Sequence, residues 1–235
     1  MIKLYFKINK PYLLIHSLSC CQKLPFPEWV NLQNKLWKKF PESFNLFCKP
    51  DIAFITSNYQ NVLKQALLNS NEFLNSGLKS PEFKKLYQET KKYLNFVSRE
   101  WDKNGNKALK ILKEITGLKI PSKKIDVLIT HPRLRNGQAF PKQNIITWGH
   151  SEDWKNYSII YLCHEILHII IPEKYQEDER VELLIMLSTD FELVKKLNKK
   201  NRYKESDLPK KIVNIWQRYL SEKRPKSIIE LLKTF

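Results

Sequence analysis

The sequence predicts a helix-rich α+β fold in which a small β-sheet, with one edge strand, lies over a helix that carries ionisable side chains. Three observations support this prediction. Residues 2–8 alternate between apolar and polar types, residues 123–149 contain two short β-branched stretches, and most other segments have apolar residues at helical spacing. With 235 residues, the chain can bury a sizeable core in one large domain or two small ones.

The N-terminal segment predicts a β-hairpin followed by a helix. Residues 2–8 form the first strand, the chain turns at Asn-Lys-Pro, and the apolar residues 12–18 return as the second strand. Residues 27–40 then have apolar side chains near helical spacing. Pro27 suits the first turn of that helix and Pro41 its end.

A long helical region is predicted from about Asn58 to Gly117. Within it, Ser80 precedes Pro81 and Glu82, which is a favourable helix start because serine caps the first turn and proline needs no hydrogen-bond partner there. Gly117 is expected at the end of the region, since glycine readily adopts the left-handed conformation that closes many helices.

The pattern changes to strands after residue 123. Residues 123–130 alternate and are rich in β-branched types, so they predict a strand. A loop is expected next, with Asn136-Gly137 as its turn, and residues 144–149 predict a second short strand.

Helices are expected in the remainder of the chain. One should begin at residues 150–154 with Ser151 as its N-cap and stop before Pro172, and another should run from about Glu177 to residue 198. Two short helices, separated at Pro225, complete the chain. We predict an N-terminal hairpin and helical region over residues 1–120 and a second region over residues 121–235, either as two lobes or as one continuous domain, with a site in the cleft between them.

One stretch, "YLCHEILHIII", carries the strongest functional signal. His164 and His168 are four residues apart on a predicted helix and therefore lie on one face, one turn apart. Two imidazole nitrogens in this arrangement can bind one zinc ion. Glu165 is rotated by about 100 degrees from His164, so it projects beside the ion and can accept a proton from a water molecule there.

The motif and its surroundings resemble the zincin metallopeptidases, and specifically the gluzincin branch. The resemblance covers about residues 124–198: a strand, a second strand, a helix with His-Glu-x-x-His, and a further helix with an acidic residue. Loosely, the stretch "DERVELLIMLSTD" resembles the ImmA/IrrE-type intracellular peptidases. These resemblances imply a zinc metalloendopeptidase in which Glu165 is the general base, and a protein or peptide as substrate.

An acidic residue must complete the zinc site, because no third histidine follows His168. Glu182 is the preferred ligand, since the apolar run after it would pack that helix face inward, and Glu179, one turn earlier, remains a rival. Asp190 could instead support a ligand histidine or lie at the surface. The full set of candidate acids is Glu177, Asp178, Glu179, Glu182 and Asp190.

Further site residues follow from the same resemblance. Residues 144–149 are similar to the zincin edge strand, which implies that Ile146, Thr147, Trp148 and Gly149 pair with an extended substrate through main-chain bonds. The other residues considered were His131 and His150 beside the cleft or at the surface, Tyr175, Arg202 and Tyr203 as oxyanion donors, Cys163 as a buried thiol, and His16 in the core or a loop.

The charge of the chain bears on its binding partners, and its cysteine content bears on its cellular location. The net charge of +17 suits an acidic partner such as nucleic acid, but the lysines are spread along the chain and favour a solvated surface. Residues 195–235 hold thirteen basic and four acidic residues, so if this end binds an acidic partner, its affinity should fall steeply with salt concentration. The four cysteines do not have the regular spacing of a disulfide framework, which fits a reducing cytoplasm. No stretch of the sequence is apolar enough to span a bilayer. The competing interpretation is a non-enzymatic, zinc-stabilised binding module.

Overall fold

The computed structural model describes residues 2–20, 27–41, 70–199, 209–222 and 225–234. It confirms a helix-rich α+β fold with one small mixed sheet. The elements in chain order are β1 (Lys3–Lys7), α1 (Lys10–Cys20), α2 (Pro27–Lys39), α6 (Ser70–Lys79), α7 (Pro81–Thr116), β2 (Lys124–Ile129), β3 (Asn136–Phe140), β4 (Ile145–Gly149), α8 (Tyr157–Ile170), α9 (Glu179–Met186), α10 (Val194–Asn198), α11 (Lys210–Glu222) and α12 (Ile228–Leu231). Short 3-10 turns occur at Pro132–Leu134, Glu173–Tyr175 and Leu232–Thr234, and a π-helical segment, Leu187–Leu193, joins α9 to α10.

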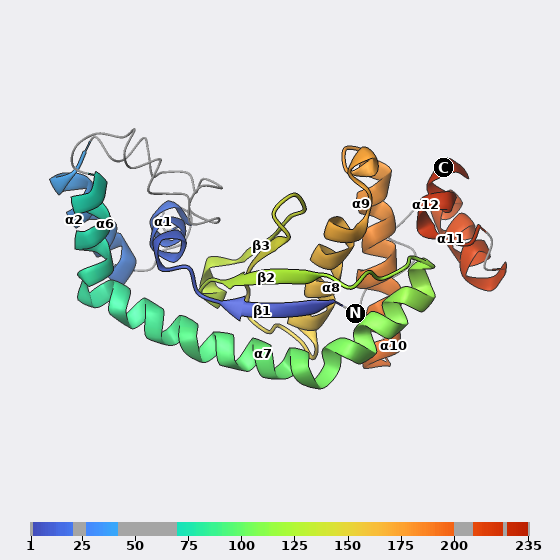
Figure 1. The fold of residues 1–235 in the computed structure, drawn as a ribbon, viewed down its shortest axis with the longest axis horizontal. Coiled ribbons are helices and arrows are strands. Elements are labelled where there is room, and N and C mark those ends of the chain that lie inside the picture. The colour runs from blue at the N-terminus through green and yellow to red at the C-terminus, as the bar shows by residue number, and fades with distance from the viewer. Residues whose placement is uncertain (1, 21–26, 42–69, 200–208, 223–224, 235) are drawn as a thin grey trace.

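The four strands have the order β1-β2-β4-β3. β1, β2 and β4 are parallel, whereas β3 is antiparallel to β4 and forms one edge of the sheet. The N-terminal strand therefore pairs with a strand more than a hundred residues later, and the helices from α1 to α7 form the connection between them. Figure 1 shows α1, α2 and α6 at one end of the sheet and α9 to α12 at the other, while α8 lies against the sheet itself.

Two hydrophobic cores lie on opposite faces of this sheet. In β2, Val127 belongs to the core that α8, α9 and the second half of α7 complete, while Leu128 belongs to the core of α1, α2 and α6. Because successive side chains of a strand point to opposite faces, the two cores bury both faces of β2 at its C-terminal end, whereas Lys3, Tyr5 and Lys7 leave one face of β1 exposed. The first core is the one that surrounds the His-Glu-x-x-His helix.

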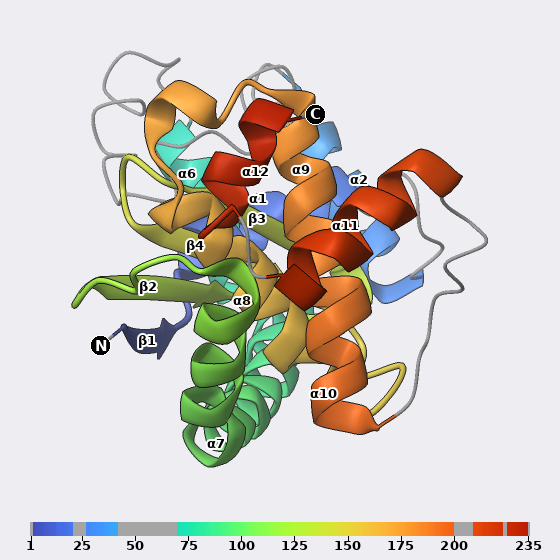
Figure 2. The same ribbon diagram turned by 90° about the vertical axis from the view of Figure 1, so that its right-hand side faces the viewer.

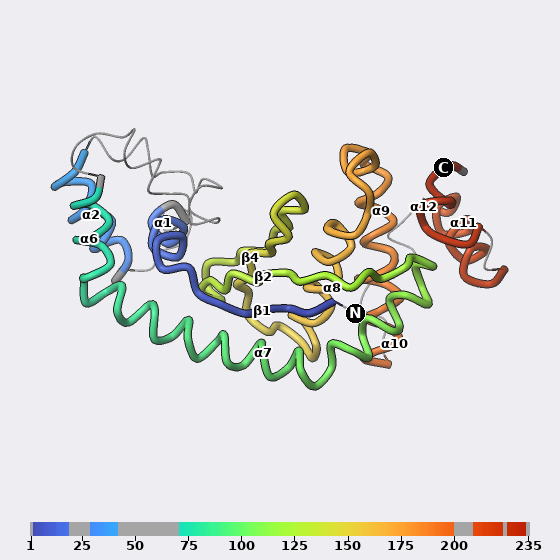
Figure 3. Tube along the Cα trace, viewed as in Figure 1, coloured from blue at the N-terminus to red at the C-terminus, as the bar shows by residue number. Residues whose placement is uncertain are grey.

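The long helix α7 connects the two cores and begins and ends where the sequence predicts. The Ser80 side chain accepts a hydrogen bond from the backbone N–H of Phe83, and Gly117 has a positive φ of 65° at the other end. The trace in Figure 3 shows α7 passing along the sheet from the N-terminal helices to the C-terminal half. The predicted helix over residues 27–40 is also confirmed as α2, and residues 58–69 of the predicted helical region lie outside the described residues.

The predicted N-terminal hairpin is wrong, because residues 12–18 belong to the helix α1 and β1 pairs with β2 instead. Leu13, Leu14 and Ile15 are fully buried, so this helix has no polar stripe that would reveal a period of 3.6 residues. The Asn9 side chain starts the helix by accepting a hydrogen bond from the backbone N–H of Tyr12 at 3.0 Å. The wider division into residues 1–120 and 121–235 stays a prediction, although strands from both parts share the sheet.

Two boundaries in the second half also differ from the predictions. The expected loop at Asn136-Gly137 is the strand β3, and the sharp turn before it falls at Arg135, which has a φ of 49°. Helix α8 begins six residues after the expected cap: Ser151 bonds to Asp153, and Asn156, with a φ of 64°, precedes the helix. The helices after Pro172, including the two separated at Pro225, are confirmed. None of the described helices is long and apolar enough to span a bilayer.

Candidate metal centre

Helix α8 brings His164 and His168 together. The apolar side chains of this helix, among them Ile160, Ile166 and Leu167, are fully buried in the first core. Packing of that face turns the two histidines toward α9, with their side chains 12% and 28% exposed. Their Nε2 atoms are 3.3 Å apart, as the i, i+4 spacing predicts.

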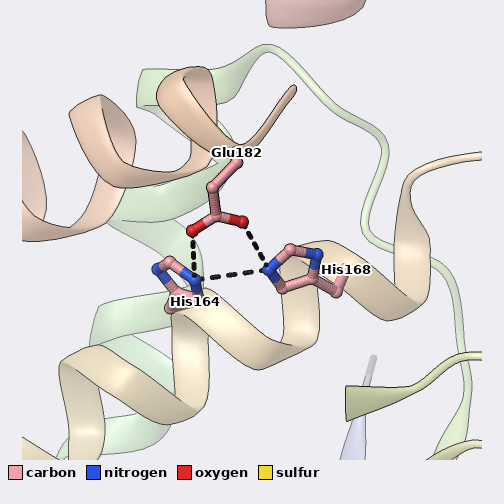
Figure 4. Close-up of side chains that lie close together, drawn as sticks. All are labelled: His164, His168 and Glu182. Carbon is pink, nitrogen blue, oxygen red and sulfur yellow. Dashed lines mark hydrogen bonds and ion pairs between the residues drawn. The ribbon is translucent and has the colours of Figure 1, made fainter. Parts of the chain in front are cut away.

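Helix α9 supplies the carboxylate of Glu182 (Figure 4). Its Oε1 lies 3.3 Å from Nε2 of His164 and its Oε2 lies 3.1 Å from Nε2 of His168. Asp178 caps the start of α9 by accepting the backbone N–H of Arg180, which fixes the first turn that bears Glu182. Among the acids considered from the sequence, the structure groups Glu182 with the histidines and leaves Glu179 exposed outside the group.

The distances within the group are close to those between the ligand atoms of a tetrahedral zinc site. Two ligand atoms at about 2.0–2.1 Å from one ion, with a tetrahedral angle between them, lie about 3.3–3.4 Å apart. The two Nε2 atoms are 3.3 Å apart, and each faces a different oxygen of the Glu182 carboxylate, at 3.3 Å for His164 and 3.1 Å for His168. Two imidazoles and one carboxylate are also a donor set that zinc enzymes use with a position left open, so the residues fit the ion.

The electrostatics of the group agree with a cation site. Hydrogen bonds to His164 and His168 hold the pKa of Glu182 well below its usual range, so the carboxylate is ionised at neutral pH. Burial lowers the pKa of His164, but the neighbouring carboxylates, that of Glu182 first, outweigh burial and raise it above the usual value.

Glu165 lies on α8 near both histidines and against β3. Its side chain is 9% exposed, and burial raises its pKa, although the nearby histidines and a hydrogen bond from the Ala139 backbone oppose the shift. A Cβ atom on Gly137 would lie 3.6 Å from Oε1 of Glu165 and 3.0 Å from the ring of Trp148. Glycine at this position therefore lets β3 approach the carboxylate closely.

Two residues of the π-helical segment lie near Nδ1 of His164, the ring nitrogen that does not face Glu182. Nδ1 of His164 is 3.3 Å from Oγ1 of Thr189 and 4.0 Å from Oδ1 of Asp190. A hydrogen bond from Nδ1 to Thr189 leaves the Nε2 lone pair available for a metal ion. Asp190 thus lies beside a candidate ligand, one of the two positions considered for it from the sequence, and π-helical turns often occur at functional sites.

The prediction that Ile146, Thr147, Trp148 and Gly149 form a substrate-binding edge is wrong. These residues belong to β4, which pairs with β2 on one side and β3 on the other, and all of them are buried. The edge of the sheet beside α8 is β3, because the Asn136–Phe140 segment that was expected to be a loop adds one more strand.

The other histidines and the Cys163 thiol lie outside the candidate metal centre and make contacts of their own. His16 is buried and stacks on Tyr12, and burial lowers its pKa to about 4. His131 bonds to Glu89 at 3.2 Å, and His150 contacts the Tyr157 hydroxyl at 3.2 Å. Cys163 is fully buried, Tyr175 is half-buried in a 3-10 turn, and Arg202 and Tyr203 lie outside the described residues.

Sequence reasoning missed three contributors to the site: Thr189, the backbone of β3, and Gln176. The Gln176 side chain donates to the carbonyls of His168 and Ile171 at 3.1 and 3.2 Å and so fixes the connection between α8 and α9. Thr189 could have been found, since it follows Glu182 by seven residues and thus shares its helix face. Nothing in the side chains of "NGQAF" predicts a strand.

No protein-family model, no curated protein and no solved structure matches the chain, so the function has to be argued from the site itself.

Proposed function

We propose that this protein is a zinc-dependent metallopeptidase that hydrolyses bonds within peptide chains. The observation that carries the proposal is the convergence of His164, His168 and Glu182 at zinc-ligand spacing, with the buried Glu165 beside them. The order of elements, an edge strand followed by β4, the His-Glu-x-x-His helix and a glutamate helix, supports the resemblance to gluzincins once β3 is taken as the edge strand.

The roles of the residues follow from their surroundings. A zinc ion held by His164, His168 and Glu182 would lower the pKa of a water molecule and polarise the carbonyl group of a peptide bond. Glu165 would accept a proton from that water while the oxygen of the water bonds to the carbonyl carbon. Glu165 would then donate this proton to the amide nitrogen as the C–N bond breaks. A raised pKa suits Glu165 to both steps, since it must release the proton it has accepted.

The free side of β3 is the proposed position of the substrate. An extended peptide can add to a sheet edge through main-chain hydrogen bonds, and Ala139 already directs its backbone toward Glu165. A peptide on this edge would pass close to Glu165. We also propose a cytoplasmic location, because the buried thiol of Cys163 and the absence of a spaced cysteine framework in the sequence fit a reducing compartment.

Replacement of Glu165 by glutamine tests the proposal. Glutamine keeps the size of the side chain but cannot accept the proton, so Glu165→Gln should retain one zinc per chain and lose about 10²- to 10⁴-fold in cleavage rate. Zinc is measured by elemental analysis, and cleavage by mass spectrometry of a proteome-derived peptide library digested with each protein. Glu179→Gln is the matched control, since it removes the same charge from an exposed acid outside the group.

The possible outcomes separate the proposals. Equal fragments from wild type and Glu165→Gln would contradict the role of Glu165. Wild-type protein that contains zinc and cleaves no peptide would favour the non-enzymatic, zinc-stabilised module. Protein purified without chelator that contains no zinc would contradict the metal centre itself.

A further inference from the structure

Helix α7 exposes an unusual concentration of positive charge. All nine of its basic residues are exposed to solvent, while only two of its five acidic residues, Asp102 and Glu114, are. The basic residues are Lys84, Lys85, Lys91, Lys92, Arg99, Lys103, Lys107, Lys110 and Lys113. Figures 1 and 2 both show that no other described element covers the outer side of this helix.

The positive residues lie along one face rather than around the helix. Steps of seven and eleven residues return to nearly the same direction on an α-helix, and such steps connect Lys85, Lys92, Arg99, Lys103 and Lys110. A helix of 36 residues is about 54 Å long at 1.5 Å per residue, so this basic face is an extended row. Exposed amide side chains, which can also donate to phosphate oxygens, accompany it at Gln88, Asn95 and Asn106.

Overall composition does not account for this row, because three of the five acids of the same helix, Glu82, Glu89 and Glu100, are partly buried. Glu82 accepts from Lys35 of α2 at 2.8 Å, and Glu89 lies 3.2 Å from Nε2 of His131. In the part of the chain that the structure describes, none of the nine cations of α7 forms an ion pair. Their charge therefore remains available to a partner.

The opposite sign prevails around the metal centre. Residues 173–192, which include α9, contain seven acidic and two basic residues. An extended anion would thus be attracted to α7 and repelled from the entrance of the metal centre. The two regions therefore differ in the sign of their charge, with a formal net charge of +4 for the residues of α7 and −5 for residues 173–192.

We propose that the outer face of α7 binds nucleic acid through the phosphate backbone, without reading base sequence. A long row of lysines and one arginine matches the regular negative charge of a duplex, which carries one phosphate charge per about 1.7 Å of its axis. An anionic membrane fits this face less well, since a helix that lies in a bilayer surface inserts an apolar side. The apolar side of α7, with Val97, Ala108 and Leu112, is buried in the protein core.

This surface is independent of the proposed peptidase activity. The row of basic residues lies on α7, and no residue of α7 belongs to the metal centre. The proposal also differs from the expectation based on residues 195–235, whose basic residues are spread over α10, α11 and segments outside the described residues. A binding experiment with variants of each set can therefore distinguish α7 from residues 195–235.

Fluorescence anisotropy with a 30-base-pair duplex of arbitrary sequence provides the test. The variant replaces Lys85, Lys92, Lys103 and Lys110 by glutamine, and the control replaces the exposed Lys195, Lys196, Lys210 and Lys211 in the same way. Both variants lose four positive charges. Circular dichroism and the melting temperature verify that each remains folded.

The α7 variant should bind the duplex at least about 10-fold more weakly at low salt, while the control should stay within about threefold of wild type. The logarithm of affinity should fall linearly with the logarithm of salt concentration, and the slope should decrease by about one for each lysine that contacts a phosphate. Equal losses in the two variants would overturn the proposal, because they would indicate an effect of net charge alone. Absence of wild-type binding, or tighter binding to phosphatidylserine vesicles than to the duplex, would also overturn it.

Discussion

The candidate metal centre has two walls of different character: a buried wall, formed by Glu165 of α8 against β3, and an exposed wall, formed by Glu182 at the start of α9. Glu165 is 9% exposed, whereas the Glu182 side chain is 57% exposed. Both carboxylates lie near the same two histidines, yet burial raises the pKa of Glu165, and direct hydrogen bonds to the imidazoles lower that of Glu182.

This contrast supports the two roles proposed for these glutamates. A carboxylate that remains ionised and points at both Nε2 atoms is suited to bind a cation, and one whose charged form is disfavoured is suited to exchange protons. The difference arises from position, because residue types are identical and only Glu165 is enclosed by a strand. Variants of the exposed wall should therefore change metal binding, and variants of the buried wall should change the rate of peptide hydrolysis.

The largest effect on metal binding is expected at the exposed wall. Glu182→Gln removes the negative charge and an anionic ligand, so zinc affinity should fall by more than the about 10- to 100-fold that outer supporting residues contribute. Glu179→Gln, one turn away and outside the group, should retain wild-type affinity. Competition with a chromogenic chelator measures both, and a greater loss in Glu179→Gln would reverse the assignment of the ligand.

A smaller loss of affinity is expected when the support of His164 is removed. Thr189→Val keeps the shape of the side chain but deletes the hydroxyl that lies 3.3 Å from Nδ1 of His164. The imidazole would lose the partner that fixes its orientation, and zinc affinity should fall by about 10- to 100-fold. Thr189→Ser, which restores a hydroxyl, should recover most of it in the same competition assay. Wild-type affinity in Thr189→Val would show that Asp190 alone supports the histidine.

The exposed wall was more predictable from the sequence than the buried wall. His164 and His168 follow from a fixed helical spacing, and Glu182 from the apolar run that places the next helix. Both inferences depend on local geometry within one helix. The capped ends of α7 were predictable for the same reason, since Ser80 and Gly117 act on their own turns.

The buried wall depends on pairing between segments, which side-chain patterns encode weakly. β3 contains glycine, alanine and polar residues, and it is a strand because β4 offers it backbone partners and Trp148 leaves space only for Gly137. Dependence on tertiary surroundings also explains why residues 12–18, which belong to α1, were predicted as a strand. A helix that is buried on every side shows no alternation between apolar and polar faces, and its tertiary surroundings decide its conformation.

The smallest effect concerns stability, where the two walls should again differ. Behind the buried wall, the Ser158 hydroxyl contacts the Glu152 carboxylate and accepts a hydrogen bond from Nε1 of Trp148 at 2.9 Å. Ser158 is 1% exposed, so water cannot replace the hydroxyl. Ser158→Ala should lower the free energy of unfolding by about 1–3 kcal/mol, which corresponds to about 2–4 °C in melting temperature per kcal/mol for a chain of this size.

At the exposed wall, the matched change is Arg180→Ala, which breaks the ion pair between Arg180 and Asp178 at 2.7 Å. Both groups face solvent, which screens their attraction and hydrates the charge that remains, so the melting temperature should not change measurably. Thermal unfolding of the metal-free proteins, followed by circular dichroism, compares the variants without a contribution from zinc binding. Equal decreases in melting temperature for Ser158→Ala and Arg180→Ala would mean that polar contacts contribute equally to stability at the two walls. Burial would then no longer explain why the pKa values of the two glutamates differ.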